Sequence, residues 1–558
     1  MEHEAARLLW ATLAAVSLLS YLYLASLRRR HGSARPLPPG PRPLPVIGNA
    51  LDLRGGHLHH TLARLARAHG PVMRLQLGPV PAVAISSRDA AREALTRHDR
   101  RLSGRYVVDA VRARGWADRS LLNMASSDPL WKLQRGILAS HVFSPRSLAE
   151  ARGVRERKVR DLVGHFRARA GTVVDFGRVL YGGMINLVSS AFFSVDVVVD
   201  VVGGDDAGGS DSAAAAHGIR EHVESIADLM TRANVSDLAP FLRPLDLQGR
   251  RRAAARHLGE IYRVVDGIIE RRLAENAAAG DKKHGDFLQV LLDQMSAGKI
   301  DRGTVKAIVF EVFVTGGDTI TITVEWAVAE LLRNPGTMAK LRAEIKEALG
   351  DKQSVEEPDV AALPYLQAVV KEAMRLHPVA PLLVPHKAVE DGVEVCGYAV
   401  PKGSTVFFNV WAIMRDPALW DDPDEFSPER FLVGGRAAEM GSKGKDFEFI
   451  PFGSGRRQCP GMPGIGSPAV DCRVHLPLHV APGTRGARVA AAAADCRGSE
   501  SGMPMAERVV PHVLASLLHA FEWRLPEGMT AEQLDVSERF TTGNVLAVPL
   551  KAVPVAIT

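Results

Sequence analysis

Cysteine is scarce in this chain of 558 residues, and several charge and repeat patterns are missing. The four cysteines, Cys396, Cys459, Cys472 and Cys496, are too few and too clustered for a disulfide framework, which excludes the disulfide-rich secreted domains and favours a reducing compartment. Lysine and arginine number 69 against 63 acidic residues and form no block interleaved with aromatic residues, so the sequence does not indicate nucleic-acid binding. No repeat with the period of a solenoid protein occurs.

Apolar residues are plentiful, and a long run of them lies near the amino terminus. Hydrophobic residues make up 46% of the chain, which is enough for a sizeable core. Residues 8–27 carry no charge and precede three arginines at 28–30, so this run could span a bilayer as a helix and leave the rest of the chain in the cytosol. A cleaved signal peptide is the alternative. We expect residues 1–30 to form a single-pass anchor in the endoplasmic reticulum membrane.

A proline-rich stretch, PLPPGPRPLP at positions 36–45, follows the predicted anchor. Its fixed φ angles and missing N–H groups exclude helix and sheet, so we expect residues 31–50 to be a stiff hinge; an SH3-type ligand is the alternative. Residues 51–558 are expected to form one domain, mostly α-helical with a small β-sheet region. Strand-like alternation occurs at 72–77 and 82–86, and helical spacing occurs at 145–168, 219–231, 250–275, 286–295 and 363–376.

A single cysteine lies in the stretch FIPFGSGRRQCPGMP, which occupies residues 449–463. Cys459 follows a glycine-containing loop and precedes Pro460, so its thiol lies at a turn toward a helix. Backbone N–H groups there, together with Arg456 and Arg457, favour a thiolate. A buried free cysteine beside a glycine turn is the alternative.

The same stretch reads Phe452-x-x-Gly455-x-Arg457-x-Cys459-x-Gly461, which resembles the haem-binding loop of the cytochrome P450 family of haem-thiolate monooxygenases. The segments FEVFVTGGDT, ITVEWAVAELL and FNVWAIMRDP resemble most the plant microsomal branch that includes geraniol 8-hydroxylase and related terpenoid hydroxylases. The resemblance implies the cytochrome P450 fold and a haem b group whose iron is bound by the Cys459 thiolate.

The run FVTGGDTITIT at residues 313–323 places two glycines inside an expected helix. Such glycines weaken a helix by about 1 kcal/mol each, and close approach of a flat cofactor or ligand would explain them. The run resembles the family's oxygen-activation segment, which implies that Asp318 and Thr319 are catalytic residues that relay protons. Thr315 departs from the family pattern, in which alanine or glycine is usual. A kinked core helix with a back-bonded threonine is the alternative.

Two further groups of residues match positions of the family. Glu372 and Arg375 in KEAMRLHP, with Arg430 in PERF, match a buried structural lock; a solvent-exposed pair is the alternative. Four side chains match groups that hold the haem propionates, although an ordinary amphipathic helix would also explain the first two: Trp131, Arg135, His386 and Arg457.

Residues 464–504 interrupt the pattern, because the helix expected directly after Pro463 starts only near Met505. Gly-Met-Pro at 461–463 is repeated at 502–504, so this insertion is interpreted as a retained intron. Cys472, His475, His479 and Cys496 could hold zinc, but their spacing fits no known zinc site and Pro477 breaks the helical geometry of the two histidines.

The resemblance implies a reaction that inserts one oxygen atom from O2 into a C–H bond of a small lipophilic substrate, here a terpenoid. Electrons would come from NADPH through NADPH–cytochrome P450 reductase, docking near Lys443, Lys445 and Arg456. Substrate contacts are expected from residues 104–122, 379–384 and 542–546.

Two alternative functions are open at this stage. A haem-thiolate isomerase or dehydratase would act without O2, but such enzymes tend to lack the Asp318-Thr319 pair. An inactive membrane-tethered protein would result if the 464–504 insertion spoils the site.

Overall fold

A computed structural model describes residues 35–45, 47–197, 211–232, 234–238, 240–279, 284–462 and 505–557, together with positions 10, 12, 15 and 16. The predicted anchor, the first part of the predicted hinge and the 464–504 insertion with its zinc candidates therefore fall almost wholly outside the described residues. The chain divides into two compact units: unit 1 comprises residues 1–106, 233–248 and 381–416, and unit 2 comprises 107–232, 249–380 and 417–558. Each unit is described by itself.

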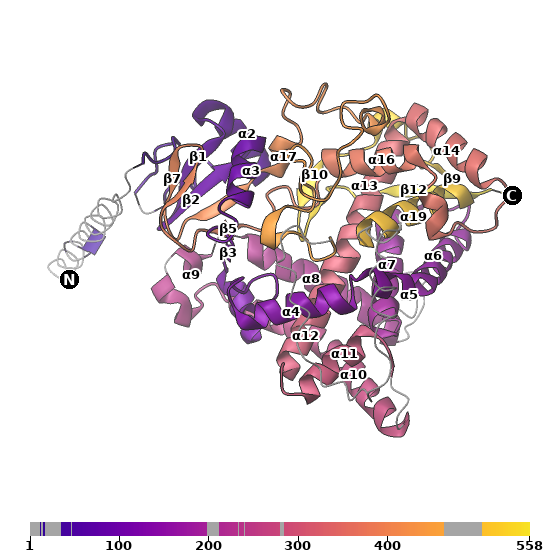
Figure 1. The fold of residues 1–558 in the computed structure, drawn as a ribbon, viewed down its shortest axis with the longest axis horizontal. Helices are drawn as coiled ribbons and strands as arrows, with labels where there is room; N and C mark the ends of the chain where they lie inside the picture. Colours follow the sequence, from indigo (N-terminus) through magenta and orange to yellow (C-terminus); the bar gives the residue numbers. More distant parts are fainter. Residues whose placement is uncertain are drawn as a thin grey trace, which may run out of the picture. The chain divides into compact units, whose positions relative to one another are not determined.

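Unit 1 is built around a five-stranded sheet with the order β1-β2-β8-β5-β3 (Figure 1). The strands are β1 (Val72–Leu77), β2 (Val80–Ile85), β8 (Thr405–Phe408), β5 (His386–Lys387) and β3 (Gly104–Arg105). The two predicted strands are confirmed as the antiparallel pair β1 and β2, and Gly78 adopts the positive φ of 57° that their short turn needs. Strand β2 then pairs in parallel with β8.

Unit 1 also contains several short helices, of which α2 (Leu58–His69) packs on the sheet and supplies part of its core. The others include α3 (Arg88–Thr96), α9 (Val235–Leu238), η2 (Pro240–Leu245) and α17 (Val410–Ile413), and a hairpin joins β6 (Val393–Val395) to β7 (Tyr398–Val400). Leu62 and Leu65 of α2 pack against Met73, Leu75 and Phe407 of the sheet. The alternating apolar residues of the strands thus meet the apolar face of an amphipathic helix.

Unit 2 is mostly helical, as the sequence predicts. Before its central helix it contains η1 (Asp109–Asp118), α4 (Pro129–His141), α5 (Pro145–Glu150), α6 (Arg152–Arg167), α7 (Phe176–Phe193), α8 (Asp211–Thr231), α10 (Arg250–Ala279) and α11 (Phe287–Ser296). After it follow α14 (Pro335–Leu349), α15 (Glu357–Val360), α16 (Pro364–Leu376), η4 (Pro428–Phe431), η5 (Gly455–Arg457), α19 (Met505–Ala520) and η7 (Ala531–Gln533). One small sheet has the order β4 (Val174–Asp175), β12 (Lys551–Ala556), β9 (Phe521–Arg524), and β10 (Glu538–Phe540) pairs with β11 (Asn544–Leu546).

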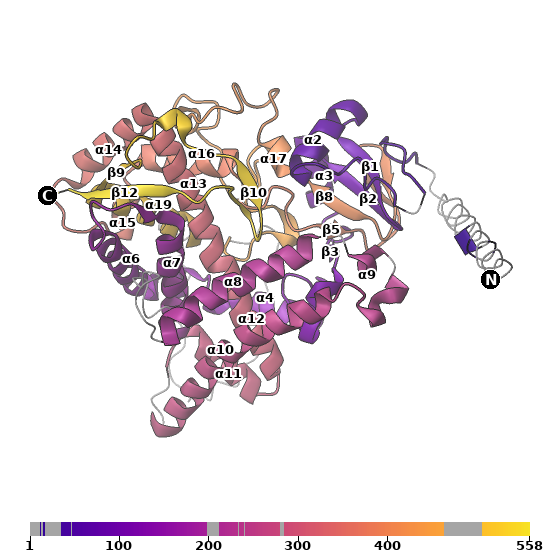
Figure 2. The ribbon, with the colours of Figure 1, turned by 180° about the vertical axis from the view of Figure 1, so that it is seen from behind.

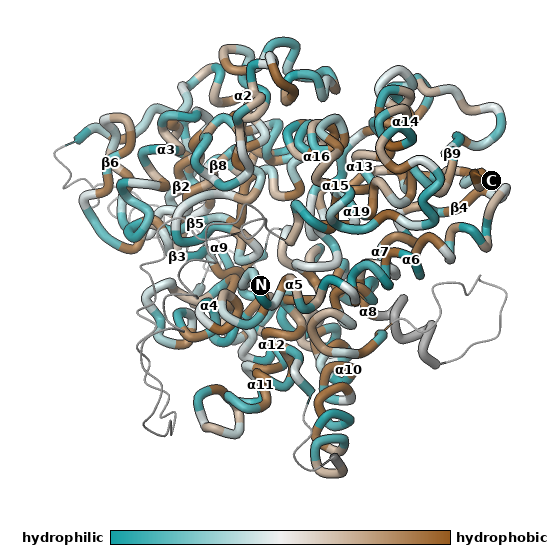
Figure 3. The backbone as a smooth tube through the Cα atoms, turned by 45° about the vertical axis from the view of Figure 1, so that its right-hand side comes forward, coloured by the Kyte–Doolittle hydropathy of each residue, from teal (hydrophilic) through white to brown (hydrophobic). Residues whose placement is uncertain are grey.

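The central helix of unit 2 runs through α12 (Arg302–Phe313), a π-helical turn η3 (Val314–Asp318) and α13 (Thr319–Arg333). Figures 1 and 2 show α13 surrounded by α7, α16 and α19, all of which contact it. In Figure 3, which colours each residue by hydropathy, both α12 and α13 contain hydrophobic stretches. Among the described residues, 302–333 is long and apolar enough to cross a membrane, but 67% of its most apolar window is buried inside the protein, as in the core helix of a globular domain.

Candidate functional site

Cys459 lies in a loop whose shape is fixed by hydrogen bonds on both sides of it. The Cys459 N–H donates to the Phe452 carbonyl at 3.1 Å, and the Cys459 carbonyl accepts from Met462 N–H at 3.1 Å. Ser454 Oγ donates to Gly444 O at 2.7 Å, and Gln458 Nε2 donates to Lys443 O at 2.9 Å. These four hydrogen bonds hold the loop without the thiol, whose sulfur has the Gly461 N–H beside it.

The charge state of the Cys459 thiol depends on two opposing influences. Burial raises its pKa, whereas the Gly461 N–H and the positive charge of Arg135 favour the thiolate. The residue nevertheless keeps part of its surface accessible. A thiol of raised pKa is protonated at neutral pH, and a metal ion that binds it displaces the proton, so iron would be needed to stabilise the thiolate here.

Trp131 and two arginines form a cationic cluster in the same unit. Arg457 lies 5.0 Å above the Trp131 ring, and both side chains donate to the Leu121 carbonyl, Trp131 Nε1 at 3.0 Å and Arg457 Nη1 at 3.3 Å. Arg457 Nη2 also donates to the Met124 carbonyl. Burial, with repulsion from Arg135 and Arg456, lowers the pKa of Arg457 to about 10. Burial lowers the pKa of Arg135 as well.

These donors fit haem b. Among the described residues the Arg135 guanidinium has no hydrogen bond or ion pair, and the neighbouring arginines repel one another, so an anionic group would relieve the strain on this cluster. Haem carries two propionates for such cations and an iron for the Cys459 thiolate. The structure thus brings together three of the four predicted propionate ligands. The fourth, His386, is a buried residue of unit 1 that lies 2.9 Å from the Leu102 carbonyl through Nδ1.

The predicted oxygen-activation segment adopts the π-helical turn η3. A π-turn widens the helix by one residue and is frequent at functional sites. Thr319 is exposed at the end of this turn, and its Oγ1 donates to the Thr315 carbonyl at 2.7 Å. The structure shows the back-bonded threonine of the second interpretation, and the proton-relay role of Asp318 and Thr319 stays a prediction.

The two glycines of this turn lie close to another helix. A Cβ added at Gly316 would lie 3.2 Å from Val188, and one added at Gly317 would lie 2.7 Å from Ile185. Both partners belong to α7. Close packing against α7 is therefore one reason for small residues at these two positions, and the approach of a flat cofactor stays a prediction.

Asp318 is the last residue of the π-turn and is held in an apolar environment. Burial raises its pKa to about 6, and a hydrogen bond with Thr542, between β10 and β11, together with the charge of Arg220, opposes the rise. Part of the residue remains accessible. A carboxyl group with a pKa near neutrality can both take up and release a proton, which suits the predicted relay with Thr319.

The three residues predicted to form a structural lock meet in the interior of unit 2. Arg375 Nε and Nη2 donate to the two Glu372 carboxylate oxygens at 2.7 and 2.9 Å, and Arg430 Nε donates to Glu372 Oε1 at 3.0 Å. Arg375 and Glu372 are fully buried. This arrangement excludes the solvent-exposed pair, and it ties α16 to η4.

Glu311 is a residue of this region that the sequence analysis missed. It is the only acid in α12, among apolar neighbours from Ala307 to Phe313, and a charged residue in such a run signals a buried polar contact. Its carboxylate accepts hydrogen bonds from the segment 116–122.

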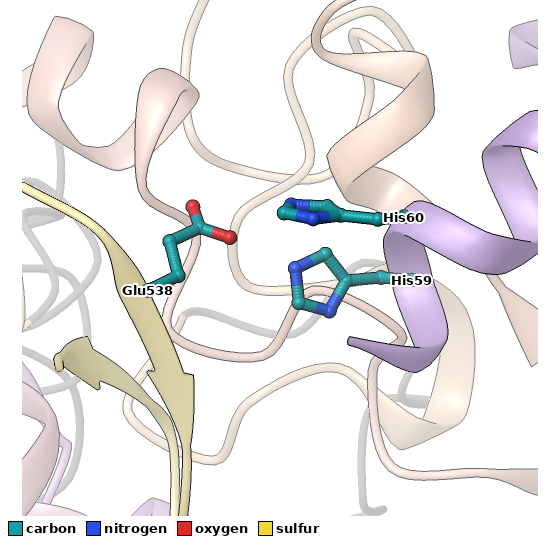
Figure 4. Close-up of side chains that lie close together, drawn as sticks. All are labelled: His59, His60 and Glu538. Carbon is teal, nitrogen blue, oxygen red and sulfur yellow. The ribbon is translucent and has the colours of Figure 1, made fainter. Parts of the chain in front are cut away.

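Two histidines of unit 1, His59 and His60, lie side by side on α2 (Figure 4). Their ring centroids are 4.3 Å apart, and His60 lies 4.4 Å from the Trp411 ring. Glu538, labelled in the same view, belongs to unit 2, where its carboxylate lies 3.6 Å from His377 Nδ1. The histidine pair by itself therefore supports no metal site in the described part of unit 1.

Comparison with known proteins identifies the family of the chain. A family model for cytochrome P450 matches residues 38–463. The chain is 54% identical over 99% of both chains to cytochrome P450 76M5 of Oryza sativa subsp. japonica, and 52% identical over 100% of both chains to ent-cassadiene C11-alpha-hydroxylase 1 of the same plant. It is 36% identical to carnosic acid synthase of Salvia pomifera over 97% of this chain and 99% of the relative.

The family match ends at Pro463, the residue directly before the predicted insertion. It includes the cysteine loop, the π-turn and the buried lock, so the motifs and the match identify the same part of the chain. The chain belongs to the cytochrome P450 family and is a haem-thiolate monooxygenase.

Proposed function

We propose that this monooxygenase inserts one oxygen atom from O2 into a C–H bond of a terpenoid, and that a polycyclic diterpene is its substrate. The observation that carries the proposal is the 52% identity, along the whole chain, to an enzyme named for hydroxylating ent-cassadiene at C11. Ent-cassadiene is a hydrocarbon, so its enzyme must orient it through apolar contacts rather than through hydrogen bonds.

The residues of unit 2 have separate roles in this proposal. Cys459 binds the haem iron, and Arg135, Arg457 and Trp131 neutralise and hydrogen-bond the propionates. When bound, haem supplies the chemistry of dioxygen activation, and a thiolate ligand favours cleavage of the O–O bond. The predicted role of His386 rests on the family resemblance alone.

Thr319 and Asp318 are proposed to deliver protons during the reaction. Thr319 is an exposed residue, and within the described part of the chain its hydroxyl is bonded to the Thr315 carbonyl alone, so it can rotate to donate elsewhere. Asp318, with a pKa of about 6, can resupply the proton through its hydrogen bond with Thr542 or through solvent.

Electrons are proposed to come from NADPH through NADPH–cytochrome P450 reductase. Lys443 and Lys445 are exposed, and the backbone of Lys443 is bonded to Gln458, the residue before the iron ligand. These two lysines and Arg456 would attract an acidic reductase surface to the cysteine side of the protein. The apolar run at 8–27 would anchor the enzyme to the endoplasmic reticulum membrane, where such a reductase also lies.

The substrate can be tested with purified protein, a plant reductase, NADPH and ¹⁸O2. We expect ent-cassadiene to yield a monohydroxylated product that carries one ¹⁸O atom, and geraniol, an acyclic terpenoid, to yield much less. Turnover of geraniol but not of ent-cassadiene would overturn the diterpene assignment. A product without ¹⁸O would overturn the monooxygenase reaction itself.

A further inference from the structure

The segment 116–122 of unit 2 is held against α12 by two carboxylates, Asp301 at the start of the helix and Glu311 near its end. Arg119 pairs with Asp301 at the partly exposed end of the segment, with Nη2 at 2.7 Å from Oδ2. Glu311 accepts hydrogen bonds from Trp116 Nε1 at 3.1 Å, from Leu121 N–H at 3.0 Å and from the Ser120 hydroxyl. A bond with the Leu122 backbone adds to these. All four donors lie within seven consecutive residues, and the backbone donors among them are those of Leu121 and Leu122, so Glu311 fixes the end of the segment that leads to α4.

Glu311 is not part of an ordinary ion pair. Among the described residues no lysine, arginine or histidine forms an ion pair with it, and burial raises the pKa of its carboxyl group to about 7 in spite of its four donors. A carboxylate in such a place is destabilised unless its hydrogen bonds are retained. The Glu311 carboxylate is therefore stabilised mainly by the hydrogen bonds that it accepts from the segment 116–122.

The other side of the same segment faces the haem-binding donors. The Leu121 carbonyl accepts from Trp131 Nε1 at 3.0 Å and from Arg457 Nη1 at 3.3 Å. One residue therefore connects Glu311, through its N–H, with two candidate propionate ligands, through its carbonyl. Gln134 of α4 makes a parallel contact by donating to the Arg119 carbonyl at 2.9 Å.

We propose that Glu311 is a positioning residue that fixes the backbone at Leu121, so that the Leu121 carbonyl aims Trp131 and Arg457 at the haem propionates. This inference rests on the proposed haem-binding roles of Trp131 and Arg457. The hydrogen bonds to Glu311 also hold residues 116–122, which form the end of the expected substrate-contact range 104–122. Glu311 acts through the loop and does not touch the reacting atoms.

The first test measures amide hydrogen exchange of the full-length chain in a peptide that covers residues 116–123. In Glu311→Gln the amide group presents an NH2 to donors that need an acceptor, so we expect exchange at Leu121 and Leu122 to become about tenfold faster or more. Ser120→Ala removes one donor without disturbing α12, and we expect a smaller acceleration of the same amides. Unchanged exchange in both variants would overturn the proposal.

Glu344 provides a matched control elsewhere in unit 2. Its carboxylate also accepts from two consecutive backbone N–H groups, those of Tyr365 and Leu366, at 2.7 and 2.9 Å. We expect Glu344→Gln to lose a similar kind of contact but to leave exchange at residues 116–123 unchanged. Acceleration there in the control would mean that Glu311→Gln acts by general loosening of the fold.

The second test is a double-mutant cycle read by haem titration of the full-length chain. We expect Glu311→Gln and Trp131→Phe each to weaken haem binding, and the double variant to be little weaker than the worse single variant, because both changes interrupt one path through Leu121. Fully additive effects would contradict the proposal. If the parent chain binds no haem at all, the proposed function fails, whereas the exchange experiment still decides whether Glu311 positions the segment.

Discussion

At the scale of single residues, three acids lie at intervals of seven along the central helix. Burial raises the pKa of Glu311 and of Glu325 to about 7, and the pKa of Asp318 to about 6. They differ in their hydrogen-bond donors. Glu311 has four within one segment, Asp318 has the Thr542 hydroxyl, and Glu325 has the Leu550 N–H at 3.4 Å. Within the described part of the chain Glu325 accepts a single, long hydrogen bond, so its ionisation should lower the free energy of unfolding the most.

Glu325→Gln should therefore change the pH dependence of stability. Between the ordinary pKa of 4.5 and the raised value of about 7, the folded protein keeps a proton that the unfolded chain has lost. The free energy of unfolding consequently falls as pH rises through this window, by up to about 3 kcal/mol for this group. Urea unfolding at about pH 5 and about pH 8 should show a smaller loss for the variant than for the parent. An equal loss would mean that Glu325 does not titrate in this range.

Thr319→Ala should uncouple electron transfer from product formation. The hydroxyl that donates to the Thr315 carbonyl is lost, so proton delivery is incomplete and reduced oxygen leaves as peroxide. We expect NADPH consumption to continue with more peroxide and less product. Asp318→Asn serves as the comparison, since it keeps the threonine and removes only the acid. Equal coupling in Thr319→Ala and the parent would make Thr319 a helix-packing residue.

At the scale of elements, the contact between α16 and η4 is a buried ion-pair network. Glu372 also accepts from Ser427 N–H at 2.9 Å, and Arg375 donates to the Pro423 and Glu425 carbonyls. Every charge in this network has several partners, which is the condition under which a buried ion pair is stable. The network joins segments that are more than fifty residues apart in the sequence.

Removing the two arginines of this network should have unequal effects. Arg375→Ala leaves the Glu372 carboxylate buried with a single remaining cation, and we expect a loss of about 3–5 kcal/mol in the free energy of unfolding. Arg430→Ala leaves the bidentate pair intact and should cost less, about 1–3 kcal/mol. Chemical denaturation of both variants measures the difference. Equal losses would show that the three residues do not act as the geometry indicates.

The sequence predicted those features of the elements that have a local signal. Alternating apolar residues located β1 and β2, and the Glu-x-x-Arg motif located the buried pair of α16. The contact of Glu311 with residues 116–122 spans about 190 positions and has no periodic signal in the sequence, so only the single acid of α12 pointed to it. The partner of Gly316 and Gly317 was missed for the same reason, because α7 is far away in the sequence.

At the scale of the whole molecule, the helix after the insertion has its own anchors. Ser442 donates to Glu507, Arg508 lies 3.9 Å from Glu357, and His512 Nε2 lies 3.0 Å from the Val355 carbonyl. Helix α19 is therefore held against unit 2 by contacts that do not involve its connection to Cys459. The entropic cost of a longer connection is small, a few kcal/mol at most.

We predict that the chain folds with or without residues 464–504 but binds haem better without them. A helix that begins directly after the ligand loop would direct its N-terminal N–H groups toward the thiolate, which is worth about 1 kcal/mol, and its packing would restrain the loop. Haem content per chain, measured for the full-length protein and for the deletion, checks this. Equal haem content and equal turnover would show that the insertion is tolerated. Transcripts that lack the segment are expected if it is a retained intron.

The identity of the iron ligand can be tested most directly with the reduced carbon-monoxide difference spectrum of the chain lacking residues 464–504, with and without Cys459→Ala. The deletion removes Cys472 and Cys496, so Cys396 is the only other thiol left. We expect a thiolate-type spectrum from the parent and its complete loss in the variant, because a methyl group cannot bind iron. A thiolate-type spectrum that survives in Cys459→Ala, or one that is absent from the parent, would contradict the assignment of Cys459 as the ligand of a haem-thiolate monooxygenase.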